Sequence, residues 1–176
     1  MARHCKVFPL IAALAWQLLA TPSARAYEDQ ASLDAALGYV LLADGDGDPV
    51  QGPGVTLGAG LGLSDLGILR ADLGYAALFA QGALRHAGRV RVEAAYLLDV
   101  LQFVPFFGLG VSLLVSEGAD HAQLRPGGHL VFGVDYLVSR TWILGLDVRT
   151  GVLLDGSRAL SATDVSLRVS RLFETF

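Results

Sequence analysis

The sequence predicts an all-β protein, an eight-stranded antiparallel up-and-down transmembrane β-barrel, and three observations support this fold class. The 176 residues are 53% hydrophobic and only 17% charged, and 21 of them are glycine, a mixture that is unusual for a soluble domain. Beyond residue 26, no apolar stretch reaches the roughly 18 residues of a transmembrane helix. Apolar residues instead alternate with small or charged ones, which is the period of a β-strand with two different faces.

The first 26 residues have the features of a cleaved secretory signal peptide. Arg3 and Lys6 precede an apolar stretch over residues 7–20, and Ala24 and Ala26 occupy the small-residue positions of a cleavage site. A membrane anchor is the alternative, but the stretch is short for a membrane span. The expected organisation is therefore a signal peptide over residues 1–26 and a barrel over residues 27–176.

Charge and cysteine content narrow the classes of partner for residues 27–176. Ten basic and 17 acidic residues give this part a net charge of −7, since Arg3, Lys6 and Arg25 lie in the signal peptide. An acidic chain argues against nucleic acid as a partner. The only cysteine, Cys5, lies before the cleavage site, so no disulfide or lipid anchor is expected in the exported chain, and no cofactor is predicted.

Eight segments alternate with the period of a strand, and each is close to the nine to eleven residues, roughly, that a tilted membrane strand needs. Their apolar rows are Leu33–Leu41, Val55–Leu63, Leu69–Phe79, Val90–Leu98, Phe107–Val115, Leu130–Tyr136, Trp142–Val148 and Val165–Val169. A soluble barrel would bury its bulky apolar face and expose its charges. Here the charges share a face with glycine and serine, which suits a narrow lumen surrounded by lipid. The pattern therefore favours a membrane barrel over a soluble one.

The connections between these segments are expected to alternate in length. The long ones span residues 44–53, 81–88, 117–127 and 155–163, and the short ones span residues 64–67, 99–103 and 139–141. Bacterial barrels have long external loops and short periplasmic turns, with both termini in the periplasm. The alternation thus predicts which end of the barrel faces outward.

With this pattern, residues 27–176 resemble the small eight-stranded outer-membrane β-barrels, such as the OmpA transmembrane domain, OmpX and the OmpW group. The resemblance is one of architecture, with one local signal, an aromatic final strand that ends in Phe176. Phe173, and not Phe176, shares a face with Val165, Leu167 and Val169, so either Phe173 closes the strand or a bulge shifts the register. The resemblance implies a bacterial outer-membrane location, outer-membrane lipid and lipopolysaccharide as partners, and insertion by the barrel-assembly machinery; a monomer is expected.

The candidate functional site is a set of charged residues on the face of small residues, predicted to point into the lumen. Its members are Arg70, Asp72, Arg91, Glu93, Asp135, Asp147, Arg149 and Arg168, with Asp34 and His129 as further candidates. Unpaired buried ions cost several kcal/mol each, roughly, so arginines and carboxylates are expected to pair with one another. Such a network either holds the barrel together or lines a polar path for small solutes.

Asp44, Asp46 and Asp48 form a weak candidate for a divalent metal site. Their spacing resembles the start of a calcium loop, but Pro49 and Val55 stand where an EF-hand needs glycine and an acidic ligand. A plain acidic hairpin loop explains the run better. The sequence therefore predicts no metal site.

Some eight-stranded outer-membrane barrels are enzymes that modify lipid A through a histidine beside a serine. His86, His121 and His129 are followed two residues later by Gly88, Gln123 and Val131, so the His-x-Ser pattern of the deacylases is missing. The sequence therefore predicts a barrel that is not an enzyme. A structural or surface-interaction role is favoured, and a narrow channel for small solutes is the alternative.

Overall fold

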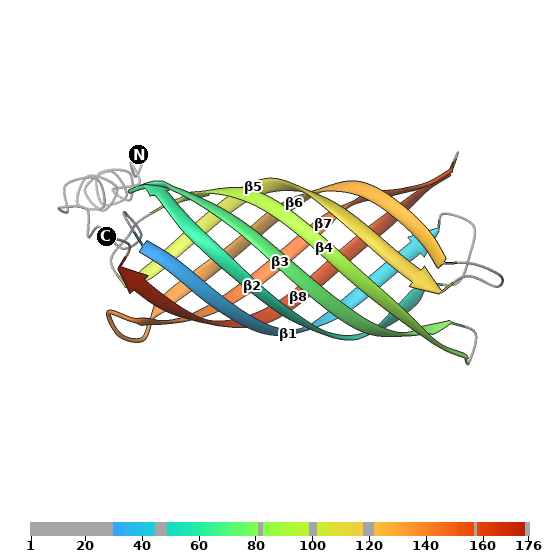
Figure 1. Ribbon diagram of the computed structural model, residues 1–176, viewed down its shortest axis with the longest axis horizontal. Coiled ribbons are helices and arrows are strands. Elements are labelled where there is room, and N and C mark those ends of the chain that lie inside the picture. The colour runs from blue at the N-terminus through green and yellow to red at the C-terminus, as the bar shows by residue number, and fades with distance from the viewer. Residues whose placement is uncertain are drawn as a thin grey trace, which may run out of the picture.

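The structure is a computed structural model that describes residues 30–44, 49–80, 83–98, 102–117, 122–156 and 158–174. Its strands are β1 (Gln30–Asp44), β2 (Val50–Ser64), β3 (Gly67–Ala80), β4 (Ala83–Leu97), β5 (Phe103–Glu117), β6 (Ala122–Leu137), β7 (Trp142–Asp155) and β8 (Arg158–Glu174). Each strand pairs antiparallel with the next, and β1 pairs with β8 to close the barrel (Figure 1). The predicted eight-stranded up-and-down architecture is confirmed. Within these residues, no helix is long and apolar enough to cross a membrane.

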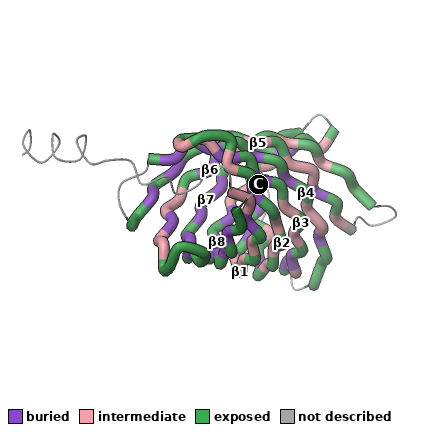
Figure 2. Tube along the Cα trace, turned by 60° about the vertical axis from the view of Figure 1, so that its left-hand side comes forward, coloured by how far each residue is buried: buried purple, intermediate pink, exposed green. Residues whose placement is uncertain are grey.

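The two faces of each strand follow the alternation in the sequence. Leu37, Leu57 and Leu73 have exposed fractions of 69%, 68% and 65% on the outer surface. The residues that alternate with them along each strand point inward. Figure 2 shows buried and exposed positions alternating along the strands. Because side chains alternate across a sheet and the sheet is closed, this parity assigns nearly every strand residue to the inside or the outside.

The predicted alternation of long and short connections is wrong. The strands are separated by residues 45–49, 65–66, 81–82, 98–102, 118–121, 138–141 and 156–157, so no connection exceeds five residues. Most of the residues assigned to long loops extend the strands instead, as in the pairs Tyr39 with Pro53 and Phe79 with Leu84. Glycine, proline and polar residues interrupt the apolar alternation there, but backbone pairing to neighbouring strands continues the ladder.

The last strand settles which phenylalanine shares its outward face. Phe173 pairs with Ala31 and is 39% exposed, so it lies on the outer surface as its parity predicts. Pairing of β8 with β1 runs without a register shift from Leu160 to Glu174, which excludes the predicted alternative of a bulge over these residues. Phe176 lies outside the described residues.

Outward-facing aromatic rings gather at the end of the barrel where β1 begins and β8 ends, referred to below as the terminal end. Tyr96 and Phe107 have ring centroids 5.6 Å apart, and Phe103 and Tyr136 have theirs 4.9 Å apart. Trp142 and Phe173 lie at the same end, at the start of β7 and near the end of β8. Aromatic residues of this kind form the girdles that mark the boundary between lipid and water in membrane barrels.

The interior contains two apolar clusters that the alternation in the sequence does not predict. The cluster at the terminal end comprises Ile68, Ala95, Leu97, Val104, Phe106, Val131, Ile143 and Leu172. The cluster toward the opposite end comprises Val40, Leu42, Ala76, Leu78, Ala87, Leu114 and Leu153. Both sets have the same inward parity as the charged residues, but they lie nearer the strand ends. An eight-stranded barrel is just narrow enough for such side chains to fill it.

A change of one outward leucine tests the assignment of the faces. Leu73 lies at the middle of β3, so Leu73→Arg places an unpartnered charge where the outer face is predicted to meet the centre of the lipid. We expect a loss of about 2 to 4 kcal/mol in the free energy of unfolding, measured by urea titration in lipid vesicles. Leu63→Arg is the matched control, because Leu63 is 67% exposed but lies near the terminal end of β2. It should cost about 0 to 1 kcal/mol, and equal losses at the two positions would contradict the assignment.

Candidate functional site

The structure places all eight charged residues of the candidate site on the inner face of the barrel. They come from β3, β4, β6, β7 and β8. Seven of them are at most 5% exposed, namely Arg70, Arg91, Glu93, Asp135, Asp147, Arg149 and Arg168. Asp72 is partly buried. Parity alone brings these residues to one compartment, and closure of the barrel brings them within contact distance.

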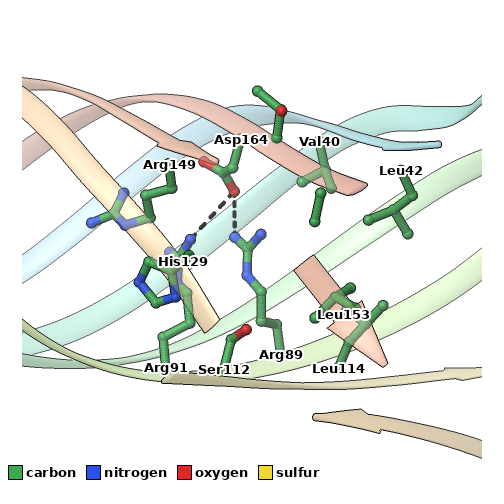
Figure 3. Close-up of a pocket in the computed structure, with 12 residues that line it drawn as sticks. Val40, Leu42, Arg89, Arg91, Ser112, Leu114, His129, Arg149, Leu153 and Asp164 are labelled. Carbon is green, nitrogen blue, oxygen red and sulfur yellow. Dashed lines mark ion pairs between the residues drawn. The ribbon is translucent and has the colours of Figure 1, made fainter. Parts of the chain in front are cut away.

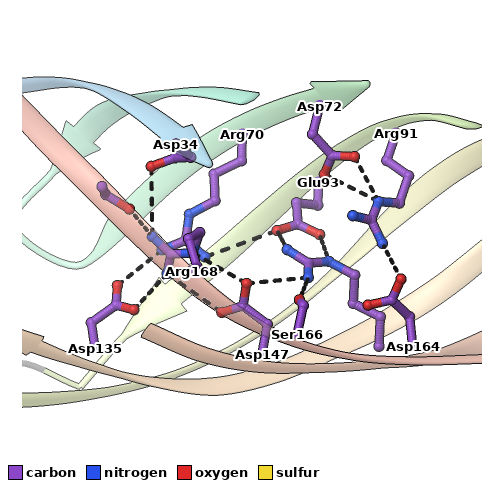
Figure 4. Close-up of polar contacts among 12 residues, drawn as sticks. Asp34, Arg70, Asp72, Arg91, Glu93, Asp135, Asp147, Asp164, Ser166 and Arg168 are labelled. Atoms are coloured by element: carbon purple, nitrogen blue, oxygen red, sulfur yellow. Dashed lines mark hydrogen bonds and ion pairs between the residues drawn. The ribbon is translucent and has the colours of Figure 1, made fainter. Parts of the chain in front are cut away.

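Six of these side chains form a closed ring, here called the arginine–carboxylate ring, in which cations and anions alternate (Figure 4). In order around the ring they are Arg70, Glu93, Arg149, Asp147, Arg168 and Asp135, with nitrogen-to-oxygen distances between 2.5 and 3.9 Å. Arg149 donates to both carboxylate oxygens of Glu93 at 2.9 Å, the bidentate geometry that makes such pairs strong. Three guanidinium groups face three carboxylates, so the ring is electrically balanced.

A second group of charges, here called the Asp164 cluster, lies nearer the opposite end. Asp164 Oδ2 is 2.5 Å from Arg89 Nη2 and 3.5 Å from Arg91 Nη1. Arg91 Nε also donates to Asp72 Oδ1 at 2.8 Å. Arg89 and Asp164 were not in the predicted set, although they have the same inward parity as Arg91 and Arg168. Applying the alternation to every charged residue of each strand would have included them.

The two further candidates, Asp34 and His129, both contact the arginine–carboxylate ring. Asp34 Oδ1 lies 3.6 Å from Arg168 Nη1, and Asp34 Oδ2 accepts a hydrogen bond of 3.3 Å from the Ser32 hydroxyl. His129 Nε2 lies 3.2 Å from Glu93 Oε2. Residues from β1 and β6 therefore join the network, which reaches across the interior.

An aromatic side chain connects the ring to the apolar cluster at the terminal end. The guanidinium carbon of Arg70 lies 4.4 Å from the centroid of the Phe106 ring, and that of Arg168 lies 5.9 Å from it. A cation over an aromatic face is stabilised by the ring quadrupole. Glycine makes this packing possible, because a Cβ atom at Gly133 would collide with Phe106 Cζ and one at Gly145 would stand 2.7 Å from Asp135 Oδ1.

Two small cavities remain between these groups. The larger, of about 40 Å³, lies between the Asp164 cluster and apolar side chains that include Val40, Leu42 and Leu114 (Figure 3). The smaller, of about 20 Å³, lies beside Asp34, Arg70 and other charged residues. A water molecule needs about 10 to 15 Å³ of such space. The cavities therefore have room for a few water molecules and not for a sugar or a nucleotide.

The remaining candidates from the sequence do not form a site in the described part of the chain. Asp44 is the last residue of β1, while Asp46, Asp48 and His121 lie outside the described residues. Among the residues that are described, no three histidine, cysteine or acidic side chains are grouped so that they could hold a metal ion. His86 lies on the outer face, where its Nδ1 atom forms a hydrogen bond with the Tyr75 hydroxyl.

Comparison with known proteins gives matches in structure but not in sequence. No protein-family model and no curated protein matches the chain. Neisserial surface protein A superposes with a TM-score of 0.70 at 17% identity, over 83% of this chain and 97% of that one. The N-terminal β-barrel domain of OprF from Pseudomonas aeruginosa gives a TM-score of 0.55 at 14% identity, over 83% and 98%. Ail, the attachment invasion locus protein of Yersinia pestis, gives 0.54 at 10% identity, over 83% and 99%.

These similarities concern the fold, and they agree with the closed ladder of β1 to β8 and with the apolar outer face. The architectural resemblance predicted from the sequence is confirmed at this level. The chain has the fold of the small eight-stranded outer-membrane β-barrels.

Proposed function

We propose that this chain is an integral β-barrel of the bacterial outer membrane with a closed interior, and that its role is structural or in interactions at the surface. One observation carries the proposal: the arginine–carboxylate ring lies between two apolar clusters, so side chains fill the interior along its length. A solute channel would need a continuous polar path. The two cavities described beside the charged residues, of about 40 and 20 Å³, are each too small to pass such a solute.

The energetics of the ring support a closed barrel. Removing one partner of a buried ion pair leaves an uncompensated charge, which typically costs about 3 to 5 kcal/mol. Arg149, for example, contacts both Glu93 and Asp147 and is 5% exposed. Opening a path for ions would require several such pairs to separate together. The network therefore favours one stable arrangement of the eight strands.

The outer surface supports a location in a membrane. Its exposed residues include leucine, valine, phenylalanine and tyrosine from all eight strands, and closure satisfies the backbone hydrogen bonds that lipid cannot. We propose that residues 1–26 direct export, that the barrel-assembly machinery inserts the chain, and that outer-membrane lipid and lipopolysaccharide surround it. Closure leaves no free strand edge for pairing with another copy, which supports a monomer.

The two described histidines, His86 and His129, each contact another side chain, and we propose that the barrel has no enzymatic activity. His129 faces Glu93 in the interior, beside a cavity of about 40 Å³ that is far too small for an acyl chain of lipid A. His86 pairs with Tyr75 on the outer face.

The location is tested by fractionating cells that express the full chain. We expect the protein in the outer-membrane fraction, with Tyr27 as its first residue, because the signal peptide exports it and the apolar outer face is insoluble in the periplasm. N-terminal sequencing and sedimentation provide the readouts. Recovery from the periplasm without detergent would overturn the proposed location.

The closed interior is tested by recording currents across planar bilayers. We expect no discrete conductance steps from the wild-type protein, since the ring and both apolar clusters obstruct the lumen. A commercial porin preparation inserted in the same bilayers serves as the positive control. Reproducible steps from the purified protein would establish the narrow-channel alternative instead.

A double-mutant cycle tests the structural role of the ring. Glu93→Gln and Arg149→Gln should each lower the free energy of unfolding by about 3 to 5 kcal/mol, because each leaves a buried charge without its partner. The double variant removes both charges and should cost less than the sum of the two. Asp155→Asn is the matched control, since Asp155 pairs with Arg125 at 3.0 Å but its side chain is 38% exposed. It should cost about 0 to 1 kcal/mol, and strict additivity within the ring would contradict the proposal.

A further inference from the structure

The outward rows of the described strands contain a single arginine, Arg171 of β8. Its neighbours in the same row, Val165, Leu167 and Val169, are apolar and exposed. Arg168, three residues earlier in the same strand, points inward and pairs with carboxylates. A long cationic side chain on a largely apolar surface extends toward the polar groups at the membrane interface.

The register places Arg171 in the aromatic girdle at the terminal end. It pairs with Leu33 of β1 and with Trp142 of β7, three residues before β8 ends at Glu174. A charge on the lipid face of a barrel costs about 2 to 4 kcal/mol at the midplane but only about 0 to 1 kcal/mol near the interface. Arg171 thus lies near the end of its strand, where we expect the lipid headgroups to begin.

Two aromatic rings flank the guanidinium group of Arg171. Its Cζ atom lies 5.8 Å from the centroid of the Trp142 ring and 5.2 Å from that of Phe173. Among the described residues, no carboxylate forms an ion pair with it. The rings hold the cation at the outer surface and leave its hydrogen-bond donors available to a ligand from the membrane.

We propose that Arg171, together with Trp142 and Phe173, binds the phosphodiester group of a phospholipid in the leaflet at the terminal end of the barrel. The guanidinium group presents donors in a planar fork that fits phosphate oxygens, and the two rings are of the kind that lies at headgroup depth. The inference rests on the proposed membrane location, from which it takes the lipid that surrounds the barrel.

Trp142 is a built-in reporter for this site. The full chain contains two tryptophans, Trp16 and Trp142, so Trp16→Phe makes Trp142 the only one whether or not the signal peptide is cleaved. Protein with this change is purified in maltoside detergent from membranes of cells that express the full chain. Its fluorescence is then followed as short-chain phosphatidylglycerol is added to the micelles.

We expect Arg171→Leu to require about fivefold more phosphatidylglycerol for half of the fluorescence change, which corresponds to about 1 kcal/mol for one arginine at an anionic surface. Arg171→Lys retains the charge without the planar fork, so the amount of phosphatidylglycerol that it requires should lie between those of the parent protein and Arg171→Leu. Arg85→Leu removes an exposed arginine near the opposite end of the barrel, far from Trp142, and should leave the Trp142 titration like that of the parent protein. Equal binding by the parent and Arg171→Leu would overturn the inference.

Two further titrations distinguish a phospholipid site from a general anion site. A galactolipid with the same chains but no phosphate should not distinguish the parent from Arg171→Leu, and inorganic phosphate alone should leave Trp142 fluorescence unchanged. A response to inorganic phosphate equal to that of the lipid would show a general anion site and overturn the assignment to lipid. Heat-modifiable mobility on gels is measured for each variant. A parent protein that is not a folded membrane barrel would refute the proposed function, whereas a folded barrel insensitive to Arg171→Leu refutes only the lipid site.

Discussion

Pairing of β1 with β8 is the constraint on which the rest of the structure depends. These strands come from opposite ends of the described chain, yet their register runs from Gln30 with Glu174 to Asp44 with Leu160. Closure gives every strand two partners, so strand edges disappear and the backbone hydrogen bonds are satisfied within the protein. It also divides side chains into an inner and an outer set, because successive residues point to opposite faces.

The inward-facing side chains fill a narrow lumen that contains many charges. The arginine–carboxylate ring balances three guanidinium groups against three carboxylates, and Phe106 stacks against two of the arginines. Apolar residues fill both ends of the interior. Small residues such as Gly133 and Gly145 belong to the same design, since a Cβ atom at either would collide with Phe106 or with Asp135. The ion pairs, the stacking on Phe106 and the glycines that leave room for both thus depend on one another.

The outer set is simpler, because lipid requires little beyond apolar surface. Leucine and valine cover much of the outer face, aromatic rings lie toward both ends, and Arg171 lies toward the terminal end. Arg168 and Arg171 illustrate how much parity decides. They lie three residues apart in β8 and point to opposite faces. Arg168 belongs to the arginine–carboxylate ring in the lumen, whereas Arg171 lies on the outer surface.

Alternation in the sequence by itself determined the number of strands, their antiparallel order and the face of residues such as Asp72 and Leu73, because a period of two is a local property that needs no knowledge of partners. It also indicated which charged residues share the lumen. The tertiary structure alone decided who pairs with whom: Arg149 reaches Glu93 because closure and register bring β7 and β4 across the same level of the barrel. The tertiary structure also decided where the strands end, because β2 continues through Pro53 by pairing with β1, which no alternation reveals. It decided how the lumen is filled as well, because the fit of Phe106 depends on Gly133 of another strand.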